Sequence, residues 1–142
     1  MEMEITFPGG KKVDALYKGF TIKTDQSREA GGENSAPAPF DLFLASIGTC
    51  AGIYVLGFCQ KRNISTDGLK ISLNTNRDEG THMIDKIKMN IHLPAGFPEK
   101  YREAVILSAE LCSVKRHMEN PPIFETKTLD TGEEENVYKA TE

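Results

Sequence analysis

The sequence predicts a mixed fold of α-helices and antiparallel β-strands, and three observations predict it. First, the run from Phe40 to Cys59 carries one charge, Asp41, and has the length of a helix through a small domain. Second, two later segments alternate apolar and polar residues as half-buried strands do. Third, a segment near residues 99–112 has the i, i+3, i+4 apolar spacing of an amphipathic helix. Strands with one apolar and one polar face suit an antiparallel sheet covered by helices on one side.

The length of 142 residues predicts a single domain spanning 1–142, in which roughly two thirds of the unfolded surface can be buried. Lys and Arg number 17 and Asp and Glu 21, giving a net charge of −4. This balance argues against a nucleic-acid-binding protein and for a soluble, mildly acidic one. The N-terminal residues 1–4 lack the cationic and apolar regions of a secretory signal, so we expect a cytoplasmic location.

The first 36 residues are expected to form two or three strands. Turn-forming residues at 8–10 and 18–19 separate short alternating runs, as in an antiparallel meander. The apolar residues of these runs are Ile5, Phe7, Val13, Ala15, Tyr17, Phe20 and Ile22. The polar segment from Thr24 to Ser35 contains a Gly-Gly pair and is expected to be a surface loop that leads into the apolar run.

The apolar run is expected to be one buried central helix. Pro39 suits the first helical turn, where its missing N–H is no loss, and Asp41 places a negative charge near the positive end of the helix dipole. About 20 residues span about 30 Å at 1.5 Å per residue. A membrane span is the competing interpretation. The six Gly, Ala and Ser residues of the run and the lack of a second such segment argue against it.

Positive residues at 61–62 and Asn63 are expected to end this helix. Two half-buried strands follow, around residues 69–74 and 87–93, joined by a turn at 78–81. Pro98 opens the amphipathic helix, with Tyr101, Ala104, Val105, Ser108, Leu111 and Cys112 on its buried face. Residues 112–117 either continue that helix or begin a short new one, and the Pro pair at 121–122 ends it. A last strand is expected from Ile123 to about Leu129, and after it a turn with a short strand or a frayed end.

Three cysteines are the obvious reactive groups. Cys50 lies in the middle of an apolar helix, where a small inert core residue is the favoured interpretation on that ground alone. Cys112 precedes Lys115 and Arg116, and cations or a nearby helix start lower the pKa of a thiol. Cys59 follows Cys50 by nine residues, or about 900° of helical rotation, so the two lie on opposite faces and do not pair. Arg28, in the polar loop, is by default a solvated charge.

Other chemistries find little support. No Cys-x-x-Cys pair is present, and Cys112 with His117 makes one loose couple, so we expect no metal site. The Gly pairs at 9–10 and 31–32 match neither a phosphate-binding loop nor a dinucleotide fingerprint, and no Gly-x-Ser-x-Gly elbow is present.

Two phrases of the chain resemble a known family. The segment Ser35–Cys50 (SAPAPFDLFLASIGTC) leads through prolines into the cysteine-bearing helix, and LCSVKR at residues 111–116 carries a second cysteine 62 residues after the first. Together they resemble the OsmC/Ohr family of thiol-dependent hydroperoxide reductases, over nearly the whole chain. The resemblance implies an α+β fold with antiparallel sheets around two long buried helices, and an intertwined homodimer with active sites at the subunit interface.

By this resemblance Cys50 is the peroxidatic thiolate and Cys112 the resolving cysteine of a peroxidase acting in the oxidative stress response. Cys50 attacks a hydroperoxide and becomes a sulfenic acid, and Cys112 then condenses with it to a disulfide. A dithiol reductant, lipoyl-type in some members, restores both thiols, and no cofactor is needed. The expected partners are therefore a hydroperoxide, a reductant and a second copy of the chain, with no nucleic acid and no membrane.

In the family an arginine stabilises the thiolate and a glutamate before the first helix holds that arginine. Arg28 is the best candidate for the arginine, with Glu33 or Asp41 as its anchor, and Lys115 and Arg116 are alternatives. The sequence departs from the family at Phe40, which follows Pro39 where the glutamate is usual. The alternative function is therefore a non-catalytic dimer that binds a small apolar ligand in an interfacial pocket, with both cysteines structural.

Overall fold

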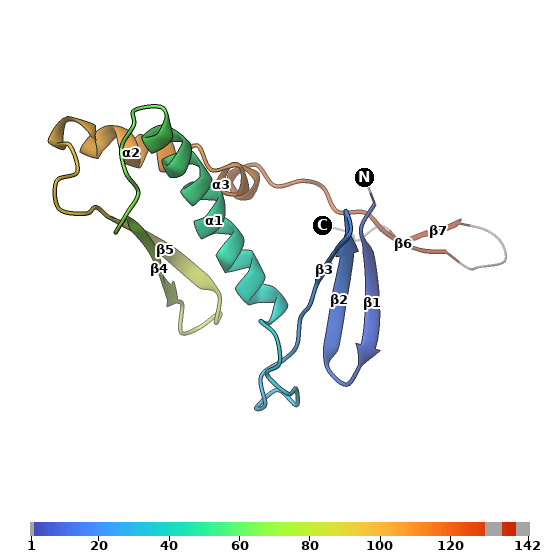
Figure 1. Cartoon of the computed structure of the whole chain (residues 1–142). Helices are drawn as coiled ribbons and strands as arrows, with labels where there is room; N and C mark the ends of the chain where they lie inside the picture. The colour runs from blue at the N-terminus through green and yellow to red at the C-terminus, as the bar shows by residue number, and fades with distance from the viewer. Residues whose placement is uncertain (1, 130–134, 139–142) are drawn as a thin grey trace.

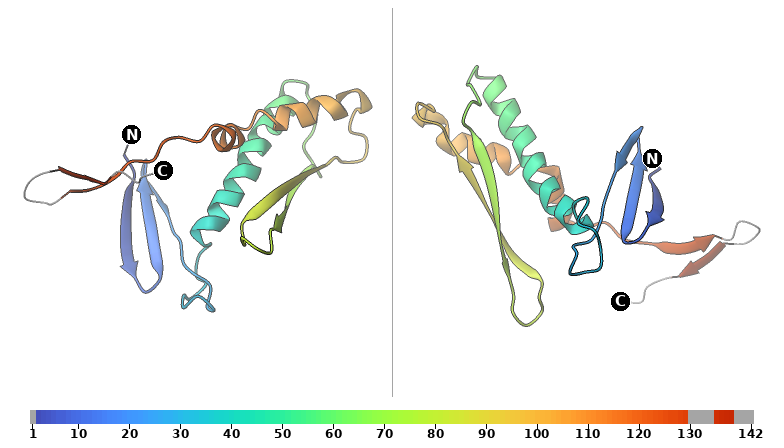
Figure 2. Two further views of the ribbon diagram at one scale, coloured as in Figure 1. Left: turned by 180° about the vertical axis from the view of Figure 1, so that it is seen from behind. Right: turned by 60° about the horizontal axis from the view of Figure 1, so that its bottom comes forward.

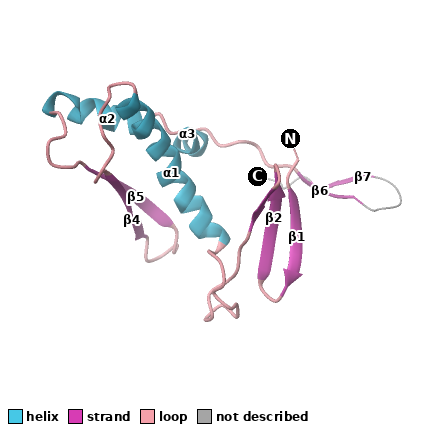
Figure 3. Ribbon diagram, in the orientation of Figure 1, coloured by secondary structure: helices cyan, strands magenta, loops and turns pink. Residues whose placement is uncertain are grey.

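The computed structural model describes residues 2–129 and, of residues 135–138, the backbone. It confirms a mixed α and β fold with antiparallel sheets (Figure 1, Figure 3). The elements in chain order are β1 (Glu4–Gly9), β2 (Lys12–Tyr17), β3 (Phe20–Ile22), α1 (Pro39–Gln60), β4 (Lys70–Arg77), β5 (Ile84–His92), η1 (Glu99–Tyr101), α2 (Arg102–Ala109), α3 (Ser113–Glu119), β6 (Thr126–Leu129) and β7 (Glu135–Tyr138).

The predicted N-terminal meander is present as the three-stranded sheet β1-β2-β3. Strand β1 pairs antiparallel with β2 around Ile5 and Ala15, and β2 pairs with β3 around Ala15 and Ile22. The turns use Gly9, Gly10 and Gly19, which have positive φ angles that glycine adopts at little cost. The sheet stands on the side of α1 opposite the β4–β5 hairpin in all views (Figure 1, Figure 2).

Helix α1 begins at Pro39, as the sequence predicts. The carboxylate of Asp41 accepts a hydrogen bond from the main-chain N–H of Ala38 at 3.0 Å, which satisfies one of the unpaired donors at the start of the helix. At the other end Arg62 donates to the carbonyl of Phe58. Asn63 takes a φ of 52°, and Ile64 N–H then returns to the carbonyl of Cys59, so the predicted end is also confirmed.

The β4–β5 hairpin packs against α1 through the small residues of the helix. Its register pairs Ile71 with Ile91 and Leu73 with Met89. A Cβ atom added at Gly48 would lie 3.1 Å from a methyl carbon of Leu73. Glycine at position 48 therefore lets the helix approach the sheet closely, and a larger side chain would push the two apart.

The second helical segment is shorter and more divided than the sequence suggests. A 3-10 turn, η1, precedes α2, which has eight residues and ends at Ala109. Of the two alternatives for residues 112–117, a new short helix is present, α3, with Cys112 as its N-cap residue. The break turns Leu111 outward, so Leu111 is exposed and Ala109 is buried in its place.

The core of the protomer lies between α1, α2 and the β4–β5 hairpin. Its buried residues are Ala51, Val55, Phe58, Cys59, Phe97, Val105, Ala109 and Cys112. One face of α1 is buried here, and Ile53 on another face is 64% exposed, so the expectation of a helix buried on all sides is wrong for the single chain. By length and composition alone α1 could also cross a membrane, a test that core helices pass as well.

The protomer exposes much more surface than its size requires. Its accessible area is 11509 Å², whereas a compact monomer of 15.7 kDa exposes roughly 7,300 Å². The three sheets have two or three strands each, and Ile123 and Phe124 before β6 are 91% and 84% exposed. Sheets this small gain stability by packing on another element, and within residues 2–129 many large apolar side chains stay exposed.

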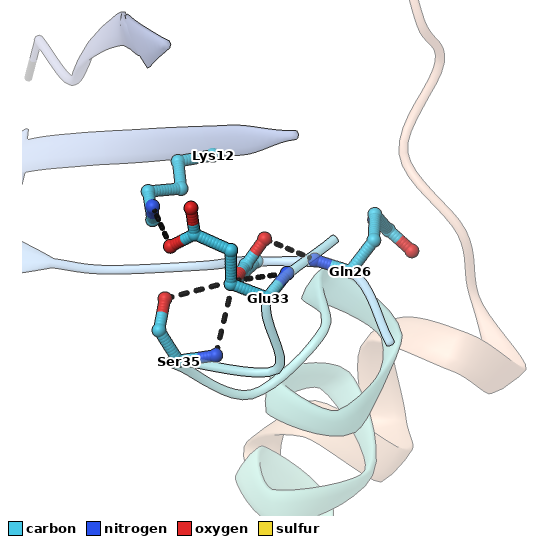
Figure 4. Close-up of polar contacts among 5 residues, drawn as sticks. Lys12, Gln26, Glu33 and Ser35 are labelled. Atoms are coloured by element: carbon cyan, nitrogen blue, oxygen red, sulfur yellow. Dashed lines mark hydrogen bonds and ion pairs between the residues drawn. The ribbon is translucent and has the colours of Figure 1, made fainter. Parts of the chain in front are cut away.

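A buried carboxylate organises the loop between β3 and α1. Asp25 is 1% exposed and accepts hydrogen bonds from the main-chain N–H groups of Gln26, Glu33 and Ser35, and from the Ser35 hydroxyl at 2.7 Å (Figure 4). Glu33 is also paired with Lys12 of β2 at 2.5 Å. The loop expected at the surface therefore has a fixed interior, which holds the start of α1 in place.

Gly32 belongs to the same arrangement. A Cβ atom there would lie 2.1 Å from the carbonyl oxygen of Gln26 and 2.8 Å from a carboxylate oxygen of Asp25. No side chain fits at this distance, so the Gly-Gly pair of the sequence serves close packing of the loop backbone.

We expect Asp25→Asn to lower the thermal unfolding midpoint and to remove part of its acid dependence. Hydrogen bonds from Ser35, followed by those from Gln26 and Glu33, lower the pKa of Asp25 to about 2. Because the folded-state pKa lies below the unfolded one, the stabilisation is complete above about pH 4 and is lost as the pH falls toward 2. Thermal unfolding followed by circular dichroism between pH 2 and 7 measures this. A variant with the same midpoints as the parent over that range would contradict it.

Candidate active site

The Cys50 thiol, in the middle of α1, faces the beginning of α3. Four groups lower the pKa of Cys50: first the main-chain N–H of Val114, then the Cys112 thiol, the N–H of Ser113 and the charge of Arg116. Partial burial of Cys50 has the opposite effect. Hydrogen bonds to a thiolate favour the charged form of the sulfur. Cys50 is half-buried, so it is both activated and accessible, and the inert-core interpretation does not fit this environment.

Cys112 is the thiol that acts on Cys50, and its own pKa shifts in the opposite direction. It is 1% exposed, its thiol lies 3.8 Å from the carbonyl of Ile47, and its sulfur accepts the N–H of Lys115. Burial raises the pKa of Cys112, and the neighbouring Cys50 raises it further. The expectation of a lowered pKa is therefore wrong, because loss of solvent outweighs the hydrogen bonds from the main-chain N–H groups of Lys115 and Val114. The pKa of one thiol of the pair is thus lowered and that of the other is raised.

Three further side chains surround this pair. Tyr54, one turn after Cys50 on α1, has its hydroxyl 3.1 Å from the hydroxyl of Ser113. Arg116 donates to the same Ser113 oxygen at 3.4 Å. Of the three cations that the sequence leaves open, Arg116 is among the groups that lower the pKa of Cys50. Tyr54 and Ser113 are missed by sequence reasoning, because they are 59 residues apart and no local pattern joins them.

The structure places the other three candidates outside this cluster. Glu33 pairs with Lys12, and Asp41 caps α1, so neither holds Arg28 in the protomer. Arg28 is exposed in the loop between β3 and α1, which lies at the foot of that helix (Figure 1). Cys50 lies eleven residues beyond the start of α1, or about 16 Å along it. Within one chain, Arg28, Glu33 and Asp41 therefore belong to the loop and helix start rather than to the thiol pair.

Phe40 lines an apolar groove instead of taking a place in the thiol cluster. Its ring centroid lies 5.4 Å from that of Phe43. The groove, about 410 Å³, is lined by Phe40, Phe43, Met83, Ile84, Asp85, Lys86, Ile87 and Met118. Phe43 lies two turns before Cys50 on α1, about 10 Å away on the same face, and Met118 lies one turn after Val114 on α3. The groove thus follows the two helices that meet at Cys50.

The third cysteine, Cys59, is not part of the thiol pair. Cys59 is fully buried, and burial raises its pKa despite the charge of Arg62. All three cysteines are free thiols. Among residues 2–129, no group of three or more His, Cys, Asp and Glu side chains is placed to hold a metal ion.

Comparisons with known proteins agree with this architecture. A protein of Psychrobacter arcticus 273-4, described as an osmotic stress induced and detoxification response protein, matches with a TM-score of 0.68 at 17% identity, covering 80% of this chain and 85% of that one. An OsmC-like protein of Mycoplasma pneumoniae matches with a TM-score of 0.64 at 14% identity, covering 84% and 87%. At these identities the matches show the shared fold.

A third solved structure, an organic hydroperoxide resistance protein OsmC of Legionella pneumophila, matches with a TM-score of 0.52 at 17% identity, covering 82% of this chain and 87% of that one. No curated protein matches the chain. The family model of the OsmC-like proteins matches residues 32–127, which include both cysteines of the thiol pair and more than half of the chain. The chain therefore belongs to the OsmC family.

Proposed function

We propose that this protein is a thiol-dependent peroxidase that reduces organic hydroperoxides, with Cys50 as the peroxidatic and Cys112 as the resolving cysteine. The observation that carries the proposal is a pair of free thiols that act on each other and whose pKa values shift in opposite directions. The thiolate is the nucleophilic form of cysteine, so the lowered pKa of Cys50 suits the attacking group. We expect the buried thiol of Cys112 to react with the product of that attack.

The proposed reaction has two steps on the protein. The Cys50 thiolate attacks the distal oxygen of the hydroperoxide, so an S–O bond forms, the O–O bond breaks, and the alcohol leaves after taking up a proton. Cys50 is then a sulfenic acid. Cys112 attacks this sulfur, its proton leaves with the hydroxyl group as water, and a disulfide results. Thiol–disulfide exchange with a dithiol, which we propose to be of the lipoyl type, restores both thiols, and a cytoplasmic location suits such a cycle.

Thiol titration before and after one equivalent of cumene hydroperoxide tests the proposal. We expect the loss of two thiols per chain, and their recovery after dihydrolipoamide is added. Cys59 is the internal control, because it is buried and should remain reduced. If Cys50 and Cys112 are unchanged while the peroxide remains, the protein is better explained as the alternative, a dimer that binds a small apolar ligand.

We further propose that the functional unit is an intertwined homodimer. Three features support this proposal: the excess of exposed surface, the small sheets, and the exposed apolar side chains of α1 and residues 123–124. Each would be stabilised by packing against a second copy of the chain. We expect a solution mass near 31 kDa, twice 15.7 kDa, by light scattering. A stable monomer at micromolar concentration would contradict the dimer.

The groove lined by Phe40, Phe43 and Met118 favours hydroperoxides with an apolar body over hydrogen peroxide. We expect Phe43→Ala to raise KM for cumene hydroperoxide about tenfold or more, because burying an aromatic side chain against an apolar ligand contributes about 1.5–3 kcal/mol. Its KM for hydrogen peroxide should be unchanged. Phe20→Ala, which removes an aromatic ring outside the groove, is the control. Equal changes for both peroxides would show that the groove does not select the substrate.

A further inference from the structure

We infer that the hydroxyl groups of Tyr54 and Ser113 position Arg116 and the first turn of α3 against the Cys50 sulfur. This inference rests on the proposed function and adds two positioning residues to it. Neither hydroxyl is placed to react with a peroxide. Each acts through the groups that contact the sulfur.

The contacts meet at the Ser113 side chain. Its oxygen lies 3.1 Å from the Tyr54 hydroxyl and accepts a hydrogen bond from Arg116 at 3.4 Å. A serine hydroxyl offers one donor and two acceptor sites, so it can hold both partners at once. The backbone of Tyr54 is held by α2, because the Ser108 hydroxyl donates a hydrogen bond to the Tyr54 carbonyl at 2.9 Å. The cluster thus joins α1, α2 and α3.

Helix geometry places the side chains of Tyr54, Ser113 and Arg116 near Cys50. Tyr54 follows Cys50 by four residues, so the two side chains are neighbours on one face of α1. Ser113 and Arg116 are three residues apart on α3 and also share a face. The main-chain N–H of Ser113 is among the groups that lower the pKa of Cys50, and the side chain of the same residue anchors the cation.

A neutral anchor has an electrostatic advantage at this site. A carboxylate that holds an arginine offsets part of the positive charge felt by a nearby thiolate, whereas a hydroxyl orients the guanidinium and leaves its charge intact. The side-chain anchor of Arg116 is of this neutral kind, because its guanidinium donates to the hydroxyl of Ser113. Lys115 differs from Arg116 in its anchor, because its ammonium group is paired with the carboxylate of Glu110.

The groups that set the ionisation of Cys50 are few. From α3 they are the N–H groups of Val114 and Ser113 and the charge of Arg116, and from the turn before α3 the Cys112 thiol. The side chain on α1 that reaches these groups is Tyr54. His117 contacts the Ser113 carbonyl at 2.7 Å and belongs to the same turn of α3. Removing one hydroxyl should therefore change the titration of Cys50 through these groups.

The test is the pH dependence of Cys50 alkylation by iodoacetamide, followed at that peptide by mass spectrometry. We expect Tyr54→Phe and Ser113→Ala each to shift the profile to higher pH and to slow alkylation at pH 7 about threefold, the size of effect of one lost hydrogen bond. The double variant should be no slower than Ser113→Ala, because both changes act through one contact. Arg116→Ala should shift the profile in the same direction, and Arg116→Lys should shift it less.

Tyr101→Phe is the matched control, since its ring packs on Phe58 away from the thiol pair, and its profile should equal that of the parent. Circular dichroism identifies any variant that does not fold. The alkylation profiles of the folded variants then test the inference. Unchanged profiles in folded Tyr54→Phe and Ser113→Ala would overturn the inference. Because alkylation needs no peroxide, this result is independent of whether the protein turns over hydroperoxides.

Discussion

Cys50→Ser is expected to reduce hydroperoxide turnover by at least about a thousandfold, because the proposed mechanism has no other nucleophile. A serine hydroxyl does not ionise near neutral pH, so the contacts with Val114 and Arg116 cannot convert it into an attacking anion. The measurement is the rate of cumene hydroperoxide consumption in the presence of dihydrolipoamide. The fold should be retained, because sulfur and oxygen differ little in size at this half-buried position.

Cys59→Ser is the control for this substitution. Cys59 lies on the same helix, but it is fully buried and its pKa is raised by burial. Its replacement is expected to leave kcat and KM nearly unchanged while lowering stability slightly, since a hydroxyl would then be buried in an apolar core. If Cys59→Ser were the inactivating change and Cys50→Ser the silent one, the assignment of the site would be wrong.

Cys112→Ser is expected to permit the first reaction and to stop the second. One alcohol molecule should form per chain, after which the enzyme should hold Cys50 as a sulfenic acid and turnover with a dithiol should fall by about two orders of magnitude or more. Cys112 is the thiol in contact with Cys50, so no other described cysteine can replace it. Excess peroxide should then drive Cys50 to the sulfinic state.

Intact-mass spectrometry and a sulfenic-acid trap measure this outcome. An increase of one oxygen in Cys112→Ser, absent from Cys50→Ser, is the expected pattern. Sustained turnover by Cys112→Ser with dihydrolipoamide would mean that the reductant attacks the sulfenic acid directly, and Cys112 would then not be the resolving cysteine.

The sequence predicts much of the fold because the relevant signals are local. Pro39 and Asp41 mark the start of α1, Asn63 marks its end, and alternation around Ile71 and Ile91 marks the hairpin. These features depend on backbone geometry and on which face of an element meets solvent, and both can be read from neighbouring residues.

The break between α2 and α3 is not visible in the sequence in the same way. Cys112 and Leu111 continue the apolar spacing of the helix, so the pattern predicts both on its buried face. In the structure Cys112 instead caps a new helix, with its sulfur accepting the N–H of Lys115, and Leu111 turns outward. We attribute the end of α2 and the start of α3 to packing against α1. A contact between segments that are distant in the sequence leaves no periodic pattern in either segment.

The candidate site shows the same limit. Two short phrases of the sequence predict Cys50 and Cys112, but several of the groups that lower the pKa of Cys50 belong to the backbone of residues 113–114, which any sequence could supply. The charge of Arg28, Glu33 and Asp41 and their position near the helix start make them candidates. The structure gives Glu33 and Asp41 local partners, Lys12 and the Ala38 N–H, that composition does not reveal.

A peptide map of the protein after one equivalent of cumene hydroperoxide tests the central claim most directly. We predict a disulfide between the peptides containing Cys50 and Cys112, with Cys59 in its thiol form, and the disappearance of this bond after dihydrolipoamide. A map in which peroxide is consumed and the disulfide joins Cys59 to either partner, or in which Cys50 remains a thiol, would contradict the account.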